Sequence, residues 1–124
     1  MARLTLLAVA GAAGTLSRYL VGGLVHRFLG SEFPYGTLAV NLAGCCAIGF
    51  LGTIAEEKFL LSSAMRTTLL IGFLGAFTTF SSFAYETWGL FKESEYLLAG
   101  VNVAASFAGC FVGLLLGVLL ARTI

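Results

Sequence analysis

Four long apolar stretches, separated by three short charged breaks, constrain the fold more than any other feature of this sequence. The stretches cover residues 4–28, 35–54, 65–90 and 97–121. Each is long enough to cross a bilayer as a helix, which takes roughly 20 mostly apolar residues. The breaks hold the segments Gly30-Ser31-Glu32, Glu56-Glu57-Lys58 and Lys92-Glu93-Ser94-Glu95. The pattern predicts an all-α integral membrane protein with four transmembrane helices.

The composition leaves almost no material for a soluble part. Only 10% of the 124 residues are charged, whereas soluble domains carry about a quarter. Short breaks favour antiparallel neighbours, so we expect residues 1–124 to form one four-span domain in the cell (inner) membrane, with both termini on one side. A cleaved signal peptide is the rival interpretation of Arg3 and the run from Leu4 to Ala10. The apolar character continues to Phe28, which favours a retained helix.

Positive charge barely distinguishes the two ends of the predicted bundle. Arg3, Lys58, Arg66 and Arg122 belong to the end with the termini, against Arg27, Lys92 and the deeper Arg18 at the other. Lysine and arginine in short loops set membrane orientation. This balance is compatible with insertion both ways up, and equally with one orientation fixed by a few charges.

The third stretch contains GFLGAFTTFSSF, residues 72–83, which is an unusual segment for a membrane helix. Gly72 and Gly75 weaken a helix, and the hydroxyls of Thr78 and Thr79 can replace lost backbone hydrogen bonds. Irregular backbone at membrane depth is tolerated only where protein buries it or where it lines a polar route. We therefore predict a break between Gly75 and Thr79, whose freed carbonyl oxygens suit a sodium ion.

Several other side chains at membrane depth have both a functional and a structural interpretation. Phe80 and Phe83 share one helical face, and their ring edges would attract an anion or their rings would fill the core. Asn41, one turn after Thr37, would bind an ion or make an interhelical hydrogen bond. Asn102 and Ser106 form a comparable pair in the fourth stretch.

Small residues indicate close helix packing without identifying the partner. Gly109, Gly113 and Gly117 repeat at four-residue intervals in the fourth stretch, a pattern typical of helices in close contact. The contact lies either within one subunit or between two. The three cysteines, Cys45, Cys46 and Cys110, lack the flanking residues of a metal or redox motif and are interpreted as packing residues.

The spans contain no carboxylate at mid-membrane depth, since Glu86 lies toward the end of the third stretch. A proton-coupled exporter normally needs an ionisable relay there, so passive permeation is favoured. No nucleophile paired with a base, metal-ligand cluster or phosphate loop is present, which argues against an enzyme. The expected partners are membrane lipid and a second protein chain, with no nucleic acid.

Three motifs in series resemble the bacterial fluoride channel family, called Fluc or CrcB. They are GAAGTLSRY in the first stretch, GTLAVNLAG in the second and GFLGAFTTFSSF in the third. The resemblance covers the whole chain in length, span count and motif order. It implies a fluoride-selective passive channel that lets fluoride leave the cell, built as an antiparallel dual-topology homodimer with two pores.

The resemblance also implies roles for individual residues. A structural, untransported sodium ion (Na+) would be held by the backbone carbonyls of Gly75 and Thr78 in both subunits. The expected fluoride pore residues are Asn41, Phe80, Phe83, Thr37 and Ser106, and the expected vestibule residues are Arg18 and Glu86. The chain departs from the family pattern in having Asn102 in place of a tyrosine and Cys110 in place of a serine.

Two other classes of protein share part of this pattern. A small dual-topology multidrug exporter has the same length and span count, but it requires the mid-membrane carboxylate that is missing here. A non-transporting membrane assembly subunit accounts for the glycines and leaves Asn41, Phe80 and Phe83 without a function.

Overall fold

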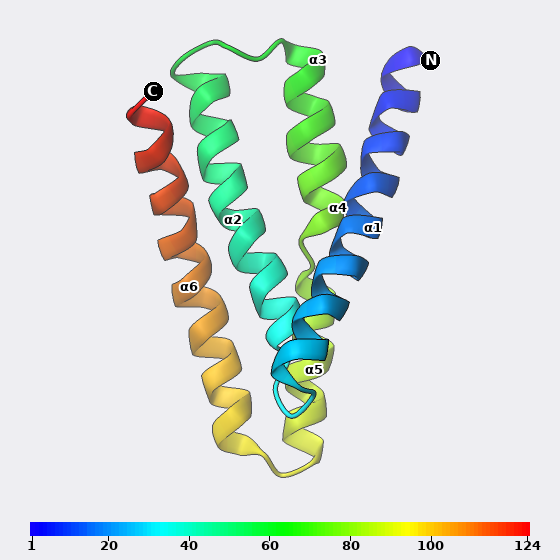
Figure 1. The fold of residues 1–124 in the computed structure, drawn as a ribbon, viewed down its shortest axis with the longest axis vertical. Coiled ribbons are helices and arrows are strands. Elements are labelled where there is room, and N and C mark those ends of the chain that lie inside the picture. Colours follow the sequence, from blue (N-terminus) through cyan, green and yellow to red (C-terminus); the bar gives the residue numbers. More distant parts are fainter.

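The computed structural model describes residues 1–124 and contains only helices and the turns between them (Figure 1). Residues Ser63 to Lys92 run end to end as one interrupted span. The elements are α1 (Ala2–Leu29), α2 (Tyr35–Glu56), α3 (Ser63–Arg66), the π-helical segment η1 (Thr67–Leu74), α4 (Gly75–Phe77), α5 (Phe80–Lys92) and α6 (Tyr96–Arg122). The predicted all-α architecture and the break in its third span are both confirmed.

The four spans, Ala2–Leu29, Tyr35–Glu56, Ser63–Lys92 and Tyr96–Arg122, are each long and apolar enough to cross a membrane. They extend one or two residues beyond most of the predicted apolar limits. The helical hydrogen-bond pattern continues into the interfacial region, where side chains such as Lys92 and Arg122 can remain hydrated while the backbone stays helical.

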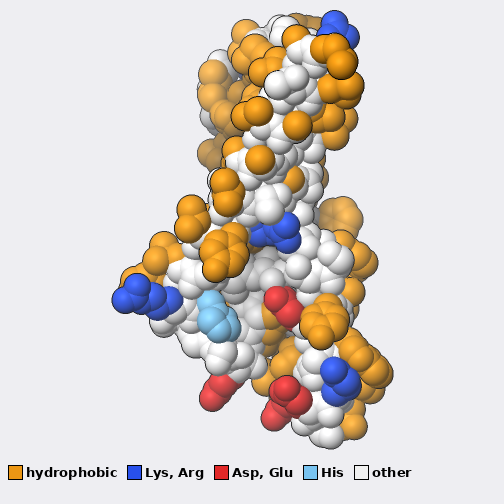
Figure 2. All heavy atoms as spheres, turned by 90° about the vertical axis from the view of Figure 1, so that its right-hand side faces the viewer, with side chains coloured by type: hydrophobic (Ala, Val, Ile, Leu, Met, Phe, Trp, Pro, Cys, Tyr) orange, Lys and Arg blue, Asp and Glu red, His pale blue; other side chains and the backbone are white.

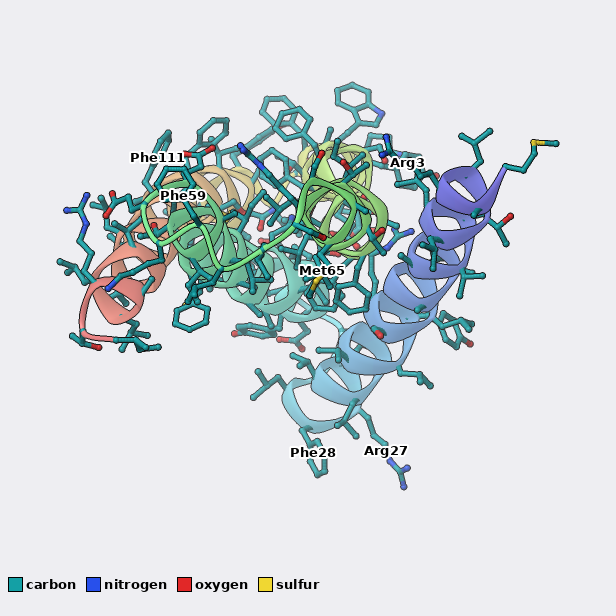
Figure 3. The ribbon with its side chains drawn as sticks, turned by 90° about the horizontal axis from the view of Figure 1, so that it is seen from above. Arg3, Arg27, Phe28, Phe59, Met65 and Phe111 are labelled. Atoms are coloured by element: carbon teal, nitrogen blue, oxygen red, sulfur yellow. The ribbon has the colours of Figure 1, made fainter.

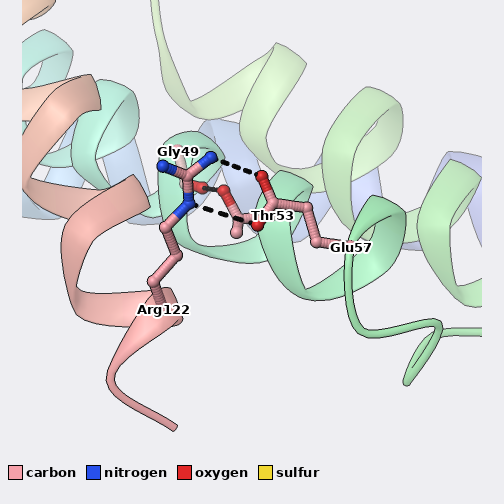
Figure 4. Close-up of polar contacts among 4 residues, drawn as sticks. All are labelled: Gly49, Thr53, Glu57 and Arg122. Carbon is pink, nitrogen blue, oxygen red and sulfur yellow. Dashed lines mark hydrogen bonds and ion pairs between the residues drawn. The ribbon is translucent and has the colours of Figure 1, made fainter.

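Both termini and the connection between α2 and α3 lie at one end of the molecule (Figure 1). Two ion pairs link elements at this end, Arg66 with Glu56 and Arg122 with Glu57. Arg122 donates from Nε to Glu57 Oε2 at 3.1 Å and from Nη2 to Oε1 at 2.6 Å (Figure 4). These hydrogen bonds hold the pKa of the Glu57 carboxyl below its ordinary value, so the link between α2 and α6 persists into mildly acidic solution.

Glycines set the distance between α2 and α6, the most extensive helix pair. A Cβ added at Gly49 would lie 2.2 Å from the carbonyl oxygen of Leu114, and one added at Gly117 would lie 2.0 Å from that of Cys46. The two backbones are therefore in direct contact. The small residues of the fourth span pack within the subunit, which is one of the two alternatives that the sequence left open.

Helix α1 packs on the third span through Gly14, where an added Cβ would lie 2.2 Å from the carbonyl oxygen of Phe73. Its C-terminal half contacts α2, since a Cβ added at Gly36 would lie 2.6 Å from the carbonyl oxygen of Gly22. Arg27 and Phe28 point away from the bundle (Figure 3). Seen from the α1 side, hydrophobic side chains cover the upper half, with a basic side chain at its top, and other charged side chains gather in the lower half (Figure 2). Only 19 of the 124 residues are buried, so most apolar side chains face lipid or another protein surface.

Candidate functional site

The break in the third span consists of Thr78 and Thr79. Both are extended, with φ −80° and ψ 155° at Thr78 and φ −149° and ψ 115° at Thr79. The Thr78 amide still donates to the Leu74 carbonyl at 3.0 Å, which ends the preceding helix. Thr79 begins the next one, because its Oγ1 accepts the Ser82 amide hydrogen at 3.2 Å, as an N-cap residue does.

Asn41 of α2 supplies the hydrogen bonds that the broken helix lacks. Its Oδ1 accepts from the Thr79 amide at 2.8 Å, and its Nδ2 donates to the Thr79 carbonyl at 3.0 Å. Gly44, almost one turn further along α2, leaves room for the break, since a Cβ there would lie 2.1 Å from Thr78 Cγ2. The interhelical hydrogen bond considered for Asn41 is therefore present, and one amide hydrogen remains free of these two contacts.

The carbonyl oxygens of Gly75 and Thr78 are among those that have lost their helical partners at the break. The Thr79 amide, which would pair with the Gly75 carbonyl in a continuous α-helix, donates to Asn41 instead. The Thr78 carbonyl accepts no hydrogen bond within the chain. Oxygen ligands of this kind suit a hard cation, and unwound backbone carbonyls coordinate sodium in membrane transporters. The residues present therefore fit a sodium ion, with Gly75 and Thr78 as the expected ligands.

A cavity of about 370 Å³ lies beside the break, between α2, the third span and α6. Asn41, Phe80, Phe83 and Ser106 line it, and so do Gly75 and Thr78. The structure thus brings together four of the five expected pore residues and both expected sodium ligands. Their roles stay predictions.

Four phenylalanine rings border the cavity, and three of them, Phe80, Phe83 and Phe107, pack together. The ring centroids of Phe80 and Phe83 lie 5.3 Å apart. Phe107 meets both rings edge-on, at 6.0 Å and 75° to Phe83 and at 6.5 Å and 88° to Phe80. Phe83 is 6% exposed, whereas Phe80 is 70% exposed. Phe83 therefore belongs to the wall of the cavity, while Phe80 is available to a further surface.

Thr37 and Glu86 lie together in a second, more polar hollow of about 470 Å³ formed by α1, α2 and α5. The Thr37 hydroxyl donates to Glu86 Oε1 at 2.8 Å. The other carboxylate oxygen of Glu86 is buried and has no hydrogen-bond partner. His26, Glu32, Glu93 and Tyr19 are the other ionisable residues of the lining. Of the five expected pore residues, only Thr37 lies here rather than in the cavity beside the break.

Arg18 lines neither of these two spaces. It lies one turn after Gly14 on α1, and its Nε is buried without a hydrogen-bond partner. The structure does not bring Arg18 and Glu86 together, although both are expected vestibule residues.

A family model described as "CrcB-like protein, Camphor Resistance (CrcB)" matches residues 5–118. The chain belongs to the CrcB family. The family predicted from the three motifs is confirmed.

Three relatives of this CrcB-family chain, each named "Fluoride-specific ion channel FluC", show how far the similarity extends. The relative from Desulforapulum autotrophicum is 46% identical over 118 residues, covering 95% of this chain and 94% of its own. That from Geobacter sulfurreducens is 46% identical over 122 residues, with 98% of each chain covered. That from Geobacter sp. strain M21 is 40% identical over 124 residues, with 100% of each covered. With its four spans, the chain is a multi-pass protein of the cell membrane.

Sequence reasoning missed two residues near the cavity of this CrcB-family chain, Phe107 and Thr87, and it placed Thr79 in the break without its contact to Asn41. Thr79 holds Asn41, Phe107 packs edge-on against both other rings, and Thr87 links α5 to α6. Asn102 Nδ2 donates to Thr87 Oγ1 at 2.9 Å, and Thr87 Oγ1 donates to the Phe83 carbonyl at 2.7 Å. The position of Phe107, directly after Ser106 among small residues, was the available signal. Asn102 and Thr87 carry no spacing that indicates their contact.

Proposed function

We propose that this chain is a fluoride-selective passive channel that lets fluoride leave the cell and so lowers its toxicity. The observation that carries the proposal is the convergence of Asn41, Phe80, Phe83 and Ser106 on one cavity beside the helix break. Its family supplies the ion, because the relatives described above are named for fluoride.

The chemistry of the cavity suits a small, strongly hydrated anion. Fluoride needs replacement ligands when it loses water, and the free amide hydrogen of Asn41, the Ser106 hydroxyl and the edges of the aromatic rings can supply them. Ring edges carry partial positive charge. None of these groups is a fixed positive charge, so fluoride is held strongly enough to enter and weakly enough to leave.

The polar hollow is the proposed vestibule. Its hydroxyl donor, Thr37, is directed at Glu86, and an arriving fluoride would take over that donor. The orphaned oxygen of Glu86 and the buried Nε of Arg18 are the charged groups proposed to govern entry, with Arg18 attracting anions along α1.

A second copy of the chain completes the proposed pore. Phe80 and Phe111 are 70% and 67% exposed at the mouth of the cavity, an apolar rim that an equivalent surface would cover. Because basic residues are almost balanced between the two ends, we propose that the two copies insert in opposite orientations. The assembly is then an antiparallel dual-topology homodimer with two pores, each shaped by both subunits.

A structural sodium ion is proposed at the centre of this dimer. The Gly75 and Thr78 carbonyls of the two subunits would hold it, and it would not be transported. When bound, it would add positive potential near both pores. Support for this assignment comes from the loss of helical hydrogen bonds at these two carbonyls.

Fluoride efflux from liposomes tests the proposal. Purified protein in fluoride-loaded vesicles should release fluoride, measured with an electrode. Phe80→Ile should slow release at least about tenfold, because isoleucine lacks the ring edge that is proposed to contact the ion. A tenfold change corresponds to roughly 1.4 kcal/mol of lost interaction with the ion. The matched control is Phe28→Ile, which changes an equally exposed ring that points away from the bundle (Figure 3). No release by the wild type, or equal release by Phe80→Ile, would contradict the proposal.

Removal of sodium tests the structural ion separately. Replacing sodium with N-methylglucamine during purification and reconstitution should lower fluoride efflux and weaken the dimer, as measured by chemical cross-linking. Returning sodium should restore both. Efflux and cross-linking that do not depend on sodium would refute the sodium site and leave the channel assignment intact.

A further inference from the structure

Cys45 of α2 and Cys110 of α6 meet on the wall of the cavity beside the helix break. Both thiols are free, and the side chains of Cys45 and Cys110 lie close enough to interact. Both residues line the cavity, whereas Cys46, the next residue along α2, does not. The contact pairs two thiols that lie far apart in the sequence.

Close packing of α2 and α6 explains why the two thiols meet. A Cβ added at Gly113, one turn after Cys110, would lie 3.1 Å from the Leu42 carbonyl oxygen and 3.9 Å from Cys45 Cβ. With the two backbones this near, Cys45 and Cys110 lie close together on the wall of the cavity.

The surroundings restrict what such a pair can bind. No group of three or more His, Cys, Asp or Glu side chains in the chain could hold a metal ion, so the four protein ligands of a structural zinc site are absent. Thiolates are soft ligands and select soft cations. A divalent soft cation held by two thiolates is electrically neutral, which avoids the cost of a net charge in an apolar cavity.

We propose that Cys45 and Cys110 form a two-thiolate site for a soft divalent cation, of which the mercuric ion is the probe. Both S–H bonds break, two S–Hg bonds form, and the two protons pass to the buffer. No oxidant or reductant is involved. Since binding releases two protons, affinity rises with pH.

Occupancy of this site has a consequence for permeation, and this part rests on the proposed channel function. The bound cation would lie on the wall shared with Phe83, Ser106 and Phe107. It would fill part of the space through which fluoride is proposed to pass. Soft divalent cations should therefore block fluoride flux.

Three single variants test the site, and each of them keeps two of the three thiols. Cys46→Ser keeps the pair, whereas Cys45→Ser and Cys110→Ser each keep Cys46 and one member of it. The full-length proteins in detergent are titrated with mercuric ion, washed with a monothiol, and assayed for remaining free thiols after denaturation. Cys46→Ser should lose both thiols to one equivalent of mercury. The other two should bind at least about a hundredfold more weakly, because one-point attachment lacks the effective concentration of a second thiol.

The site is overturned if Cys46→Ser requires two equivalents, or if Cys45→Ser retains mercury as well as Cys46→Ser does. Alanine versions of the three variants repeat the titration, so that a folding defect caused by the introduced hydroxyl is recognised. Flux is measured separately, each variant against its own untreated rate. Mercury should block the wild type and Cys46→Ser and spare Cys110→Ser. Tight binding without fluoride flux in any sample would defeat the channel proposal and support the thiol site, and equal block of all variants would contradict a block at this pair.

Discussion

Asn41 is the residue on which the shape of the break depends most directly. Its amide contacts both backbone groups of Thr79, at 2.8 Å and 3.0 Å, so it replaces hydrogen bonds that a helix would otherwise make with itself. The same side chain lines the cavity. A structural role and the proposed role in permeation therefore coincide in one residue, and a substitution there should affect both.

We predict that Asn41→Leu, which roughly preserves side-chain volume, destabilises the protein and abolishes fluoride flux. It leaves the Thr79 amide and carbonyl unpaired, at a cost of roughly 1–3 kcal/mol for each unsatisfied group. Thermal unfolding in detergent measures the loss. The control is Thr53→Val, a buried position on the same helix whose hydroxyl bonds only the Gly49 carbonyl of its own helix (Figure 4). If Asn41→Leu melts with the wild type, Asn41 does not support the break.

Asn102 is a buried polar residue of α6 whose hydrogen-bond partner lies on another helix. It is 2% exposed and donates to Thr87, which in turn donates to the Phe83 carbonyl. An amide at this position fixes α5 relative to α6 and so fixes the backbone that carries Phe83. We interpret Asn102 as a residue that positions the ring, acting through Thr87.

At the scale of elements, α2 is the helix that organises the others. It holds the break through Asn41 and Gly44 and contacts α6 backbone to backbone at Gly49. A contact of this kind requires glycine, because any side chain would collide with a carbonyl oxygen. The packing of α2 on α6 should therefore be sensitive to a single methyl group.

Gly49→Ala should separate α2 from α6, since its Cβ would lie 2.2 Å from the Leu114 carbonyl oxygen. Overpacking of this kind costs typically about 1–3 kcal/mol, which a lower midpoint of thermal unfolding would report. Gly52→Ala is the matched control, because nothing lies within 4 Å of a Cβ at that position. The packing described for α2 and α6 would be refuted by equal midpoints for the two variants.

The sequence predicted the elements better than it predicted their contacts. The break was visible because glycines and adjacent threonines are poor helix formers in an apolar span. The hydrogen bonds between Asn41 and Thr79 could not be predicted, since nothing in the local sequence around an asparagine specifies a partner on another helix. For the same reason the glycines of α6 could not be assigned to α2, and the pairing of Cys45 with Cys110 could not be foreseen.

The same reasoning applies to the aromatic residues. Spacing alone placed Phe80 and Phe83 on one face of a helix, and the structure gives a centroid distance of 5.3 Å. Spacing could not tell that Phe83 is buried while Phe80 is exposed, nor that Phe107 of α6 completes the set. Those facts depend on how α5 and α6 cross.

At the scale of the whole molecule, we predict that the balance of basic residues is required for assembly. Leu60→Lys with Thr123→Lys raises the count at the end with the termini from four, namely Arg3, Lys58, Arg66 and Arg122, to six. Such a bias should fix one orientation. Vesicles from cells that make only this variant should then lack fluoride flux, because copies in a single orientation cannot form an antiparallel dimer.

Co-expression provides the control for this prediction. A second variant with the opposite bias, Ser31→Lys and Glu93→Lys combined with Lys58→Gln, should restore flux when both are made together, and neither should conduct alone. Full flux from the first variant by itself would show that a single orientation is sufficient.

The central claim is that the cavity beside the break conducts fluoride selectively. The ratio of fluoride to chloride flux through purified protein in liposomes tests it most directly, with both ions measured by electrode on the same vesicles. Rapid fluoride release with chloride nearly excluded is the expected result. Comparable fluxes of the two ions, or no fluoride release, would contradict it.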